Sequence, residues 1–180
     1  MKPTLLKTGK NTIVLRSKYH QYLPGLESLF LLGDFGVRGD TLTAAPATLA
    51  IGDWVEQGFP YYAGNMTCRT AIDIRKEDGA KTALVIPEWR GVALAVSVNG
   101  SPRTVVAWPP YELDITGELK DGRNVIEITV LGHRRNAYGP FYLKEKWPAW
   151  TGPYQLKQYD VADKQLVPCG LLKAPYLKRS

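Results

Sequence analysis

Apolar side chains alternate with small or polar ones through much of this sequence, and this alternation favours a fold built from β-strands. Residues 92–98 (VALAVSV) carry large apolar side chains at even positions and small ones at odd positions, the period of a strand packed on one face. The same period recurs at 66–74 and 125–130, and 82–86 is a short apolar run typical of a buried strand. No window keeps the spacing of an amphipathic helix beyond about one turn. The sequence therefore predicts an all-β fold, an antiparallel β-sandwich of two stacked sheets.

Turn-forming residues separate these runs at hairpin spacing. Asn99-Gly100 follows the 92–98 run, and this dipeptide favours the positive φ angles of a tight hairpin turn. We therefore expect residues 103–107 to form the returning strand. Asp121-Gly122 supplies a similar turn before the 125–130 run.

One ten-residue pattern, L-K-x-G-[KR]-N-x-I-x-[IL], occurs twice, at 6–15 and at 119–128. The separation is too long for a solenoid repeat. We expect the same local device at both places: the Gly makes a turn, the Asn hydrogen-bonds its own backbone, and an alternating strand follows. If the first copy closes an earlier module, residues 1–25 form a seam with that module. We therefore expect residues 1–180 to be a single β-sandwich domain and a fragment of a larger multidomain protein.

The net charge of +6 raises the question of nucleic-acid binding, because clustered Lys and Arg neutralise phosphates. Only residues 133–136 and the Lys178-Arg179 pair are densely basic, and no RNP, KH or zinc-finger spacing accompanies them. We expect no nucleic-acid partner, although charge keeps a basic nucleic-acid-binding module as an alternative. No apolar run approaches the roughly 20 residues of a membrane helix, so we expect no membrane partner.

Two cysteines and two histidines give little material for a metal site. Cys68 and Cys169 lie far apart in the sequence, and alternation turns Cys68 to the same side as Ile72. We expect two buried thiols, with one long-range disulfide as the alternative. Neither His20 nor His133 lies near a Cys or an acidic pair at ligand spacing, so we expect no metal and no cofactor.

Carboxylates are the candidate catalytic groups, because glycoside hydrolysis needs two of them facing each other across a sugar. The candidates are Glu27, Asp34, Asp53, Glu56, Glu88, Glu112 and Asp114. Asp114 precedes Ile115-Thr116-Gly117, where an acid is most simply a turn cap. Glu27 and Asp34 bracket Ser28 to Gly33, which the pattern predicts as a strand. No pair is placed in one cleft, so we expect no catalytic residue here; a self-contained glycoside hydrolase using Glu27 and Asp34 is the alternative.

Two segments carry a family resemblance. GDWVEQGFPYYAGNMTCR at 52–69 resembles the W-x-x-x-G-x-P-x-Y-x-G-x-x-x-Y-R-like signature of sugar-binding jelly-roll domains of family 2-type glycoside hydrolases, with Cys68 where that group more often carries Tyr. The strand 91–100, the YELDIT run at 111–116 and the second copy of the ten-residue pattern are similar to that group's later motifs. Leu26-Glu27, the run LLGDFGV at 31–37 and RRNAYGP at 134–140 look like the C-terminal region of bacterial α-L-rhamnosidase-like hydrolases.

The resemblance implies a galactose-binding-like β-sandwich, a noncatalytic accessory domain whose catalytic carboxylates lie in another domain. Such a domain gives structural support, binds carbohydrate weakly, or does both. Its expected partner is an oligo- or polysaccharide or the neighbouring catalytic domain. The parent enzyme is expected to be extracytoplasmic, in a bacterium.

Aromatic residues are the material for carbohydrate binding: five Trp, ten Tyr and four Phe. Their flat apolar faces and polar edges suit the C–H faces of sugars, although many will fill the sandwich. Proline-rich WPPY at 108–111 belongs at a strand end, because proline cannot donate a ladder hydrogen bond. The expected carbohydrate contacts are Trp89, Trp108, Tyr111, Arg134 and Asn136.

Overall fold

The computed structural model describes residues 6–18, 20–22, 29–77, 79–138 and 166–180. The chain divides into two compact units, Met1–Gly33 and Asp34–Ser180. Within the described residues every strand belongs to the second unit. The expectation of one domain that adjoins another module through residues 1–25 stays a prediction.

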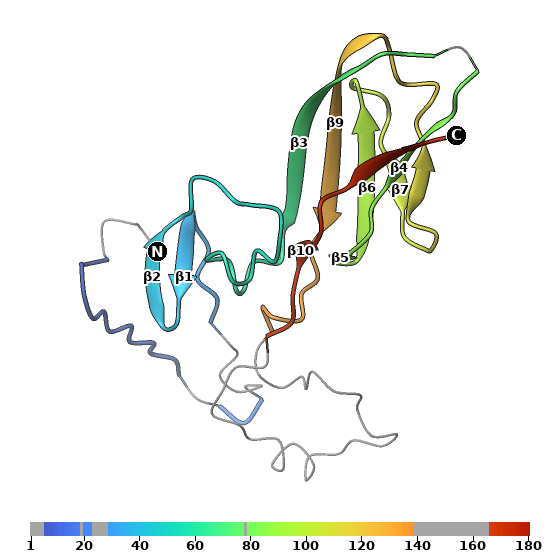
Figure 1. Cartoon of the computed structure of the whole chain (residues 1–180). Helices are drawn as coiled ribbons and strands as arrows, with labels where there is room; N and C mark the ends of the chain where they lie inside the picture. Colours follow the sequence, from blue (N-terminus) through green and yellow to red (C-terminus); the bar gives the residue numbers. More distant parts are fainter. Residues whose placement is uncertain (1–5, 19, 23–28, 78, 139–165) are drawn as a thin grey trace. The chain divides into compact units, whose positions relative to one another are not determined.

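The larger sheet of the second unit is antiparallel and has the strand order β3-β9-β6-β7. Its strands are β3 (Asn65–Ile74), β9 (Gly122–Leu131), β6 (Ala93–Val98) and β7 (Thr104–Val106). β3, β9 and β6 run alongside one another (Figure 1). Ile128 of β9 lies opposite Cys68 on one side and Val96 on the other, so these three side chains share a face of the sheet.

The second sheet has the order β11-β4-β8 and is also antiparallel. It consists of β4 (Thr82–Val85), β8 (Glu112–Asp114) and β11 (Tyr176–Arg179). Two short strand pairs complete the unit: β1 (Phe35–Arg38) with β2 (Thr41–Ala44), and β5 (Trp89–Arg90) with β10 (Gly170–Leu171). The described residues contain no helix, and hence none that could cross a bilayer.

A single hydrophobic core joins the two sheets. The even-numbered apolar residues of β6, from Leu94 to Val98, pack in one cluster with Ile126, Ile128 and Leu84. Both sheets contribute to this cluster, so each hides one apolar face against the other. The predicted all-β sandwich is confirmed.

The Asn99-Gly100 hairpin is confirmed. Asn99 has a φ of 52° and Gly100 a φ of 79°, and β7 pairs antiparallel with β6 directly after the turn. The Asn99 side chain also ties this turn to β9, because its Oδ1 accepts a hydrogen bond from the Val125 N–H at 2.9 Å.

The strand expected over Ser28 to Gly33 is wrong for the residues that the structure describes. Residues 29–33 form no strand, and the first strand, β1, begins at Phe35. An apolar run becomes a strand only when a neighbouring strand takes up its backbone hydrogen bonds. In the described part of the chain, no ladder includes residues 29–33. Ser28 itself lies outside them.

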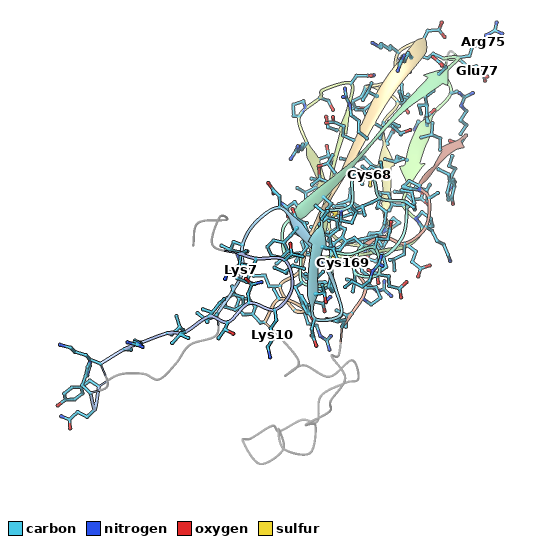
Figure 2. All side chains as sticks on the ribbon, turned by 90° about the vertical axis from the view of Figure 1, so that its left-hand side faces the viewer. Lys7, Lys10, Cys68, Arg75, Glu77 and Cys169 are labelled. Atoms are coloured by element: carbon cyan, nitrogen blue, oxygen red, sulfur yellow. The ribbon has the colours of Figure 1, made fainter. Side chains whose placement is uncertain are left out.

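The two cysteines are free, and only one is buried. Cys169 is buried, as expected, whereas Cys68 is exposed, so that prediction is wrong for Cys68. Alternation gives the correct face, but β3 is the edge strand of its sheet, and the core does not cover this part of the edge. Neighbouring groups still shield the Cys68 thiol enough for desolvation to raise its pKa. Figure 2 labels both residues.

Candidate functional site

Four loop and strand segments that are far apart in the sequence contact one another in the second unit. We call them the closure junction: residues 52–54, 89–90, 133–136 and 167–170. Asp53 Oδ1 accepts hydrogen bonds from the N–H groups of Val55 and Cys169, each at 2.9 Å. The Trp54 N–H donates to the Cys169 carbonyl at 3.0 Å. One carboxylate thus fixes its own turn and a strand more than a hundred residues away.

Asn136 is the second polar anchor of the closure junction. Its Nδ2 donates to the Val167 carbonyl at 2.8 Å, and its Oδ1 accepts from the Val167 N–H at 3.0 Å. The side-chain amide therefore pairs with the backbone of Val167 as a neighbouring strand would. Asn136 is buried, and both of these polar atoms are engaged by the protein itself.

Cys169 and Gly170 complete the junction beside β5. Cys169 Sγ donates to the Arg90 carbonyl at 3.4 Å, and Gly170 pairs with Arg90 in the β5–β10 ladder. Burial raises the pKa of the Cys169 thiol, because the thiolate is poorly solvated there. Gly170 has a φ of +134°, and a Cβ at this position would lie 2.6 Å from the Gly52 carbonyl oxygen. The chain can approach itself this closely only with glycine.

A depression beside the junction is the main candidate for a ligand site. It has a volume of about 260 Å³ and is lined by Pro87, Glu88, Trp89, Arg90, Gly91 and Tyr111. The Trp89 and Tyr111 rings meet edge to face with their centroids 5.4 Å apart. Trp89 is buried, and its indole N–H has no hydrogen-bond partner among the described residues.

Charged groups give the depression a polar rim. Glu88 pairs with Lys173 at 2.8 Å between Oε2 and Nζ. The hydrogen bond from Lys173, followed by its positive charge, lowers the pKa of Glu88, and the same pair raises the pKa of Lys173. Glu88 is therefore an anionic acceptor at neutral pH, beside the Arg90 guanidinium, which donates to the Trp89 carbonyl at 3.0 Å.

The structure brings together two of the five residues expected to contact carbohydrate. Trp89 and Tyr111 line the same depression. Trp108 is 80% exposed and does not line it, Arg134 is exposed, and Asn136 is buried in the closure junction. In the WPPY segment, Tyr111 is partly buried and packs against the core. Trp108, at the other end of the segment, is exposed on the surface.

The sequence did not single out Glu88 and Arg90 as ligand contacts. Their only signal is that they flank Trp89 in the chain. They line the depression together with Tyr111, a residue distant in the sequence, and residue order does not reveal that contact.

Several candidate carboxylates have structural partners. Asp114 Oδ1 accepts hydrogen bonds from Thr116 Oγ1 at 2.6 Å and from the Thr116 N–H at 3.0 Å. The predicted turn cap is thus confirmed, and these bonds lower the Asp114 pKa. Glu112 pairs with Lys178 at 3.5 Å. Glu27 lies outside the described residues, and within those described no three His, Cys, Asp or Glu side chains gather in a metal-binding group.

Comparison with known proteins gives likenesses to solved structures alone. No protein-family profile and no curated protein matches the chain. The fold is similar to part of the rhamnosidase from Novosphingobium sp. PP1Y, with a TM-score of 0.53 and 24% sequence identity. The match covers 83% of this chain and 14% of that chain. The β-sandwich described above is therefore similar in fold to a small part of a much longer rhamnosidase.

Proposed function

We propose that this chain is a noncatalytic accessory domain of a glycoside hydrolase, of the galactose-binding-like type. It supports a neighbouring catalytic domain and binds carbohydrate weakly at the depression whose lining includes Trp89 and Tyr111. The observation that carries the proposal is this depression, which combines two aromatic side chains with a carboxylate and a guanidinium. The likeness to a small part of a rhamnosidase supports the accessory role.

The chemistry of the rim suits a sugar ring. Aromatic rings cover the apolar C–H face of a sugar, while its hydroxyl groups need donors and acceptors at the edge. Glu88 accepts hydrogen bonds and Arg90 donates them, and both line the depression. A depression of about 260 Å³ lies below the usual range for ligand pockets, so we expect weak binding of one or two sugar units.

Calorimetric titration with rhamnose-containing polysaccharides tests this site. Glu88→Gln keeps the shape of the side chain and removes the charge, so it should weaken binding about fivefold or more through loss of a charge-assisted hydrogen bond. Glu112→Gln is the matched control, because Glu112 is also paired with a lysine and the side chains of both glutamates are 38% exposed. Equal binding by both variants, or no binding across a broad panel of polysaccharides, would refute the carbohydrate site.

The noncatalytic part of the proposal has a separate test. The purified chain should release no nitrophenol from nitrophenyl glycosides. Turnover that is lost in Glu27→Gln would instead establish the chain as a hydrolase. We further propose that the parent is a larger extracytoplasmic enzyme in which residues 1–180 form one accessory domain.

A further inference from the structure

The two copies of the ten-residue pattern form the same hydrogen-bonded device. In the second copy, Asn124 Oδ1 accepts from the Lys120 N–H at 2.9 Å, and Asn124 Nδ2 donates to the carbonyls of Lys120 and Gly122, each at 2.8 Å. In the first copy, Asn11 Oδ1 accepts from the Lys7 N–H at 2.8 Å. Asn11 Nδ2 donates to the carbonyls of Lys7 and Gly9 at 2.8 and 2.9 Å.

The turn glycines match as well. Gly9 has a φ of +91° and Gly122 a φ of +83°, both in the region that favours glycine. The device thus takes up the same backbone conformation in two separate compact units. It is a local, sequence-encoded entry into a β-strand.

The second copy shows which neighbouring strands and side chains surround the device when it lies inside a β-sandwich. It opens β9, which lies between β3 and β6. The Asn99 amide, from the turn after β6, donates to Asn124 Oδ1 at 2.8 Å and so fills the second lone pair of that oxygen. Its apolar positions Leu119, Ile126 and Ile128 are all buried in the core.

The first copy has none of this environment among the described residues. Its corresponding apolar side chains are Leu6, Ile13 and Leu15, which are 43%, 49% and 57% exposed. Residues 12–18 pair with no strand in the described part of the chain. Within that part, no donor occupies the second lone pair of Asn11 Oδ1. Lys7 and Lys10 mark this segment in Figure 2.

We infer that Leu6–Leu15 is a strand of a second β-sandwich, and that it inserts between two strands contributed by another module of the same polypeptide. The inserted strand buries Leu6, Ile13 and Leu15 in that module's core. An asparagine or similar amide donor at a turn of the module binds Asn11 Oδ1, as Asn99 binds Asn124. The inference rests on the proposed function only in taking the chain to be part of a longer protein.

A second copy of this chain is a poorer partner. The slot that fits the device in this chain, between β3 and β6, is already filled by β9. β9 pairs over ten positions with β3 and over six with β6. An incoming segment 6–15 would have to break both ladders before it could form its own.

Two matched variants of the 180-residue chain test the assignment. Asn124→Ala should lower the melting temperature by roughly 5–10 °C or prevent folding, because Asn124 is fully buried and its amide holds the backbone of Lys120 and Gly122 and the Asn99 side chain. Asn11→Ala should leave the melting temperature unchanged, because its strand belongs to another core. A comparable loss in both variants would place Leu6–Leu15 in this chain's own fold and overturn the inference.

Hydrogen exchange in the natural full-length polypeptide tests the insertion itself. The amides of residues 12–15 should exchange at least about a hundredfold more slowly than in the 180-residue chain, and Asn11→Ala should abolish that protection. Equal exchange in the two forms, or a natural polypeptide without another β-sandwich, would overturn the inference. Slow exchange of residues 12–15 without carbohydrate binding would refute only the sugar site. Carbohydrate binding without slow exchange would refute only the insertion.

Discussion

Single polar side chains join distant parts of this chain. Asp53 reaches Cys169, Asn99 reaches Asn124, and Asn136 pairs with Val167. Each of these side chains completes hydrogen bonds of backbone or amide groups that packing takes out of water. The cost of leaving such groups unpaired makes these few residues important to stability.

Asn136→Ala should destabilise the protein by about 2–3 kcal/mol, because the N–H and carbonyl of Val167 both lose their partner. Arg134→Ala is the control from the same loop, and its exposed side chain should change stability by no more than about 0.5 kcal/mol. Urea denaturation measures both. Equal stabilities would show that water replaces the Asn136 amide without cost.

The sequence indicates which polar residues matter in the closure junction, but it does not indicate what they bind. Asn136 was expected to contact a sugar, but its amide binds Val167 instead. Residue type defines which donors and acceptors are present, but not whether a ligand or the backbone uses them. The local bonds of Asn11 and Asn124 were predictable because donor and acceptor lie within four residues. The Asp53–Cys169 bond spans 116 positions and leaves no local signal.

The two thiols should react very differently with iodoacetamide. Cys68 is exposed and should be labelled in the folded protein, whereas buried Cys169 should be labelled only after unfolding. Because desolvation raises the Cys68 pKa, its labelling rate should keep increasing above about pH 8.5, the ordinary pKa of a thiol. Mass spectrometry across a pH series measures this. A rate that levels off below pH 8.5 would contradict the raised pKa.

At the scale of elements, the short β5–β10 pair depends on one glycine. Gly170→Ala combines a strained φ with the close approach to the Gly52 carbonyl, and should cost about 2–4 kcal/mol. Gly100→Ala also has a positive φ, of +79°, but open space around its Cβ, and should cost only about 1 kcal/mol. Urea denaturation compares the two. A smaller loss of unfolding free energy for Gly170→Ala would mean that the backbone of the closure junction shifts to accommodate the added Cβ.

The sequence correctly predicted strands from alternation at β3, β6 and β9 and from a short apolar run at β4, and a turn signal added the hairpin partner. The β6–β7 hairpin has both alternation and a turn signal, and β9 follows the Gly122 turn. The run expected over Ser28 to Gly33 has apolar residues, but its described part, 29–33, forms no strand and belongs to no ladder. Burial of Cys68 failed for a related reason, because strand order, not alternation, decides which strand lies at the edge.

For the whole molecule, the division into two units predicts that the second folds alone. Deletion of residues 1–33 removes no strand of the described chain, so the remaining protein should keep its circular dichroism and its stability to within about 1 kcal/mol. Deletion of residues 166–180 is the control, because it removes β10 and β11 and should abolish cooperative unfolding. A broadened transition in the first deletion would show that the units fold together.

The overall architecture was predictable because period-two patterning records which face of each strand is buried. The pairing of the two C-terminal strands, β10 and β11, with earlier strands was not predictable. The pairings of β11 with β4 and of β10 with β5 join segments about 80 or more residues apart, and an alternating pattern fits many such pairings equally well. The depression also depends on these pairings, since its rim pairs Glu88 with Lys173.

The position of β10 and β11 in the chain sets the order of events during synthesis. They follow every other described strand in the chain, yet β11 completes the ladder on β4 and Gly170 of β10 belongs to the closure junction. Until they emerge, the nascent chain holds β4 and Ile86 with their backbone and apolar surface incompletely covered. The sandwich is therefore completed only after residues 166–180 are free, and chaperones have an unfinished sheet to protect until then.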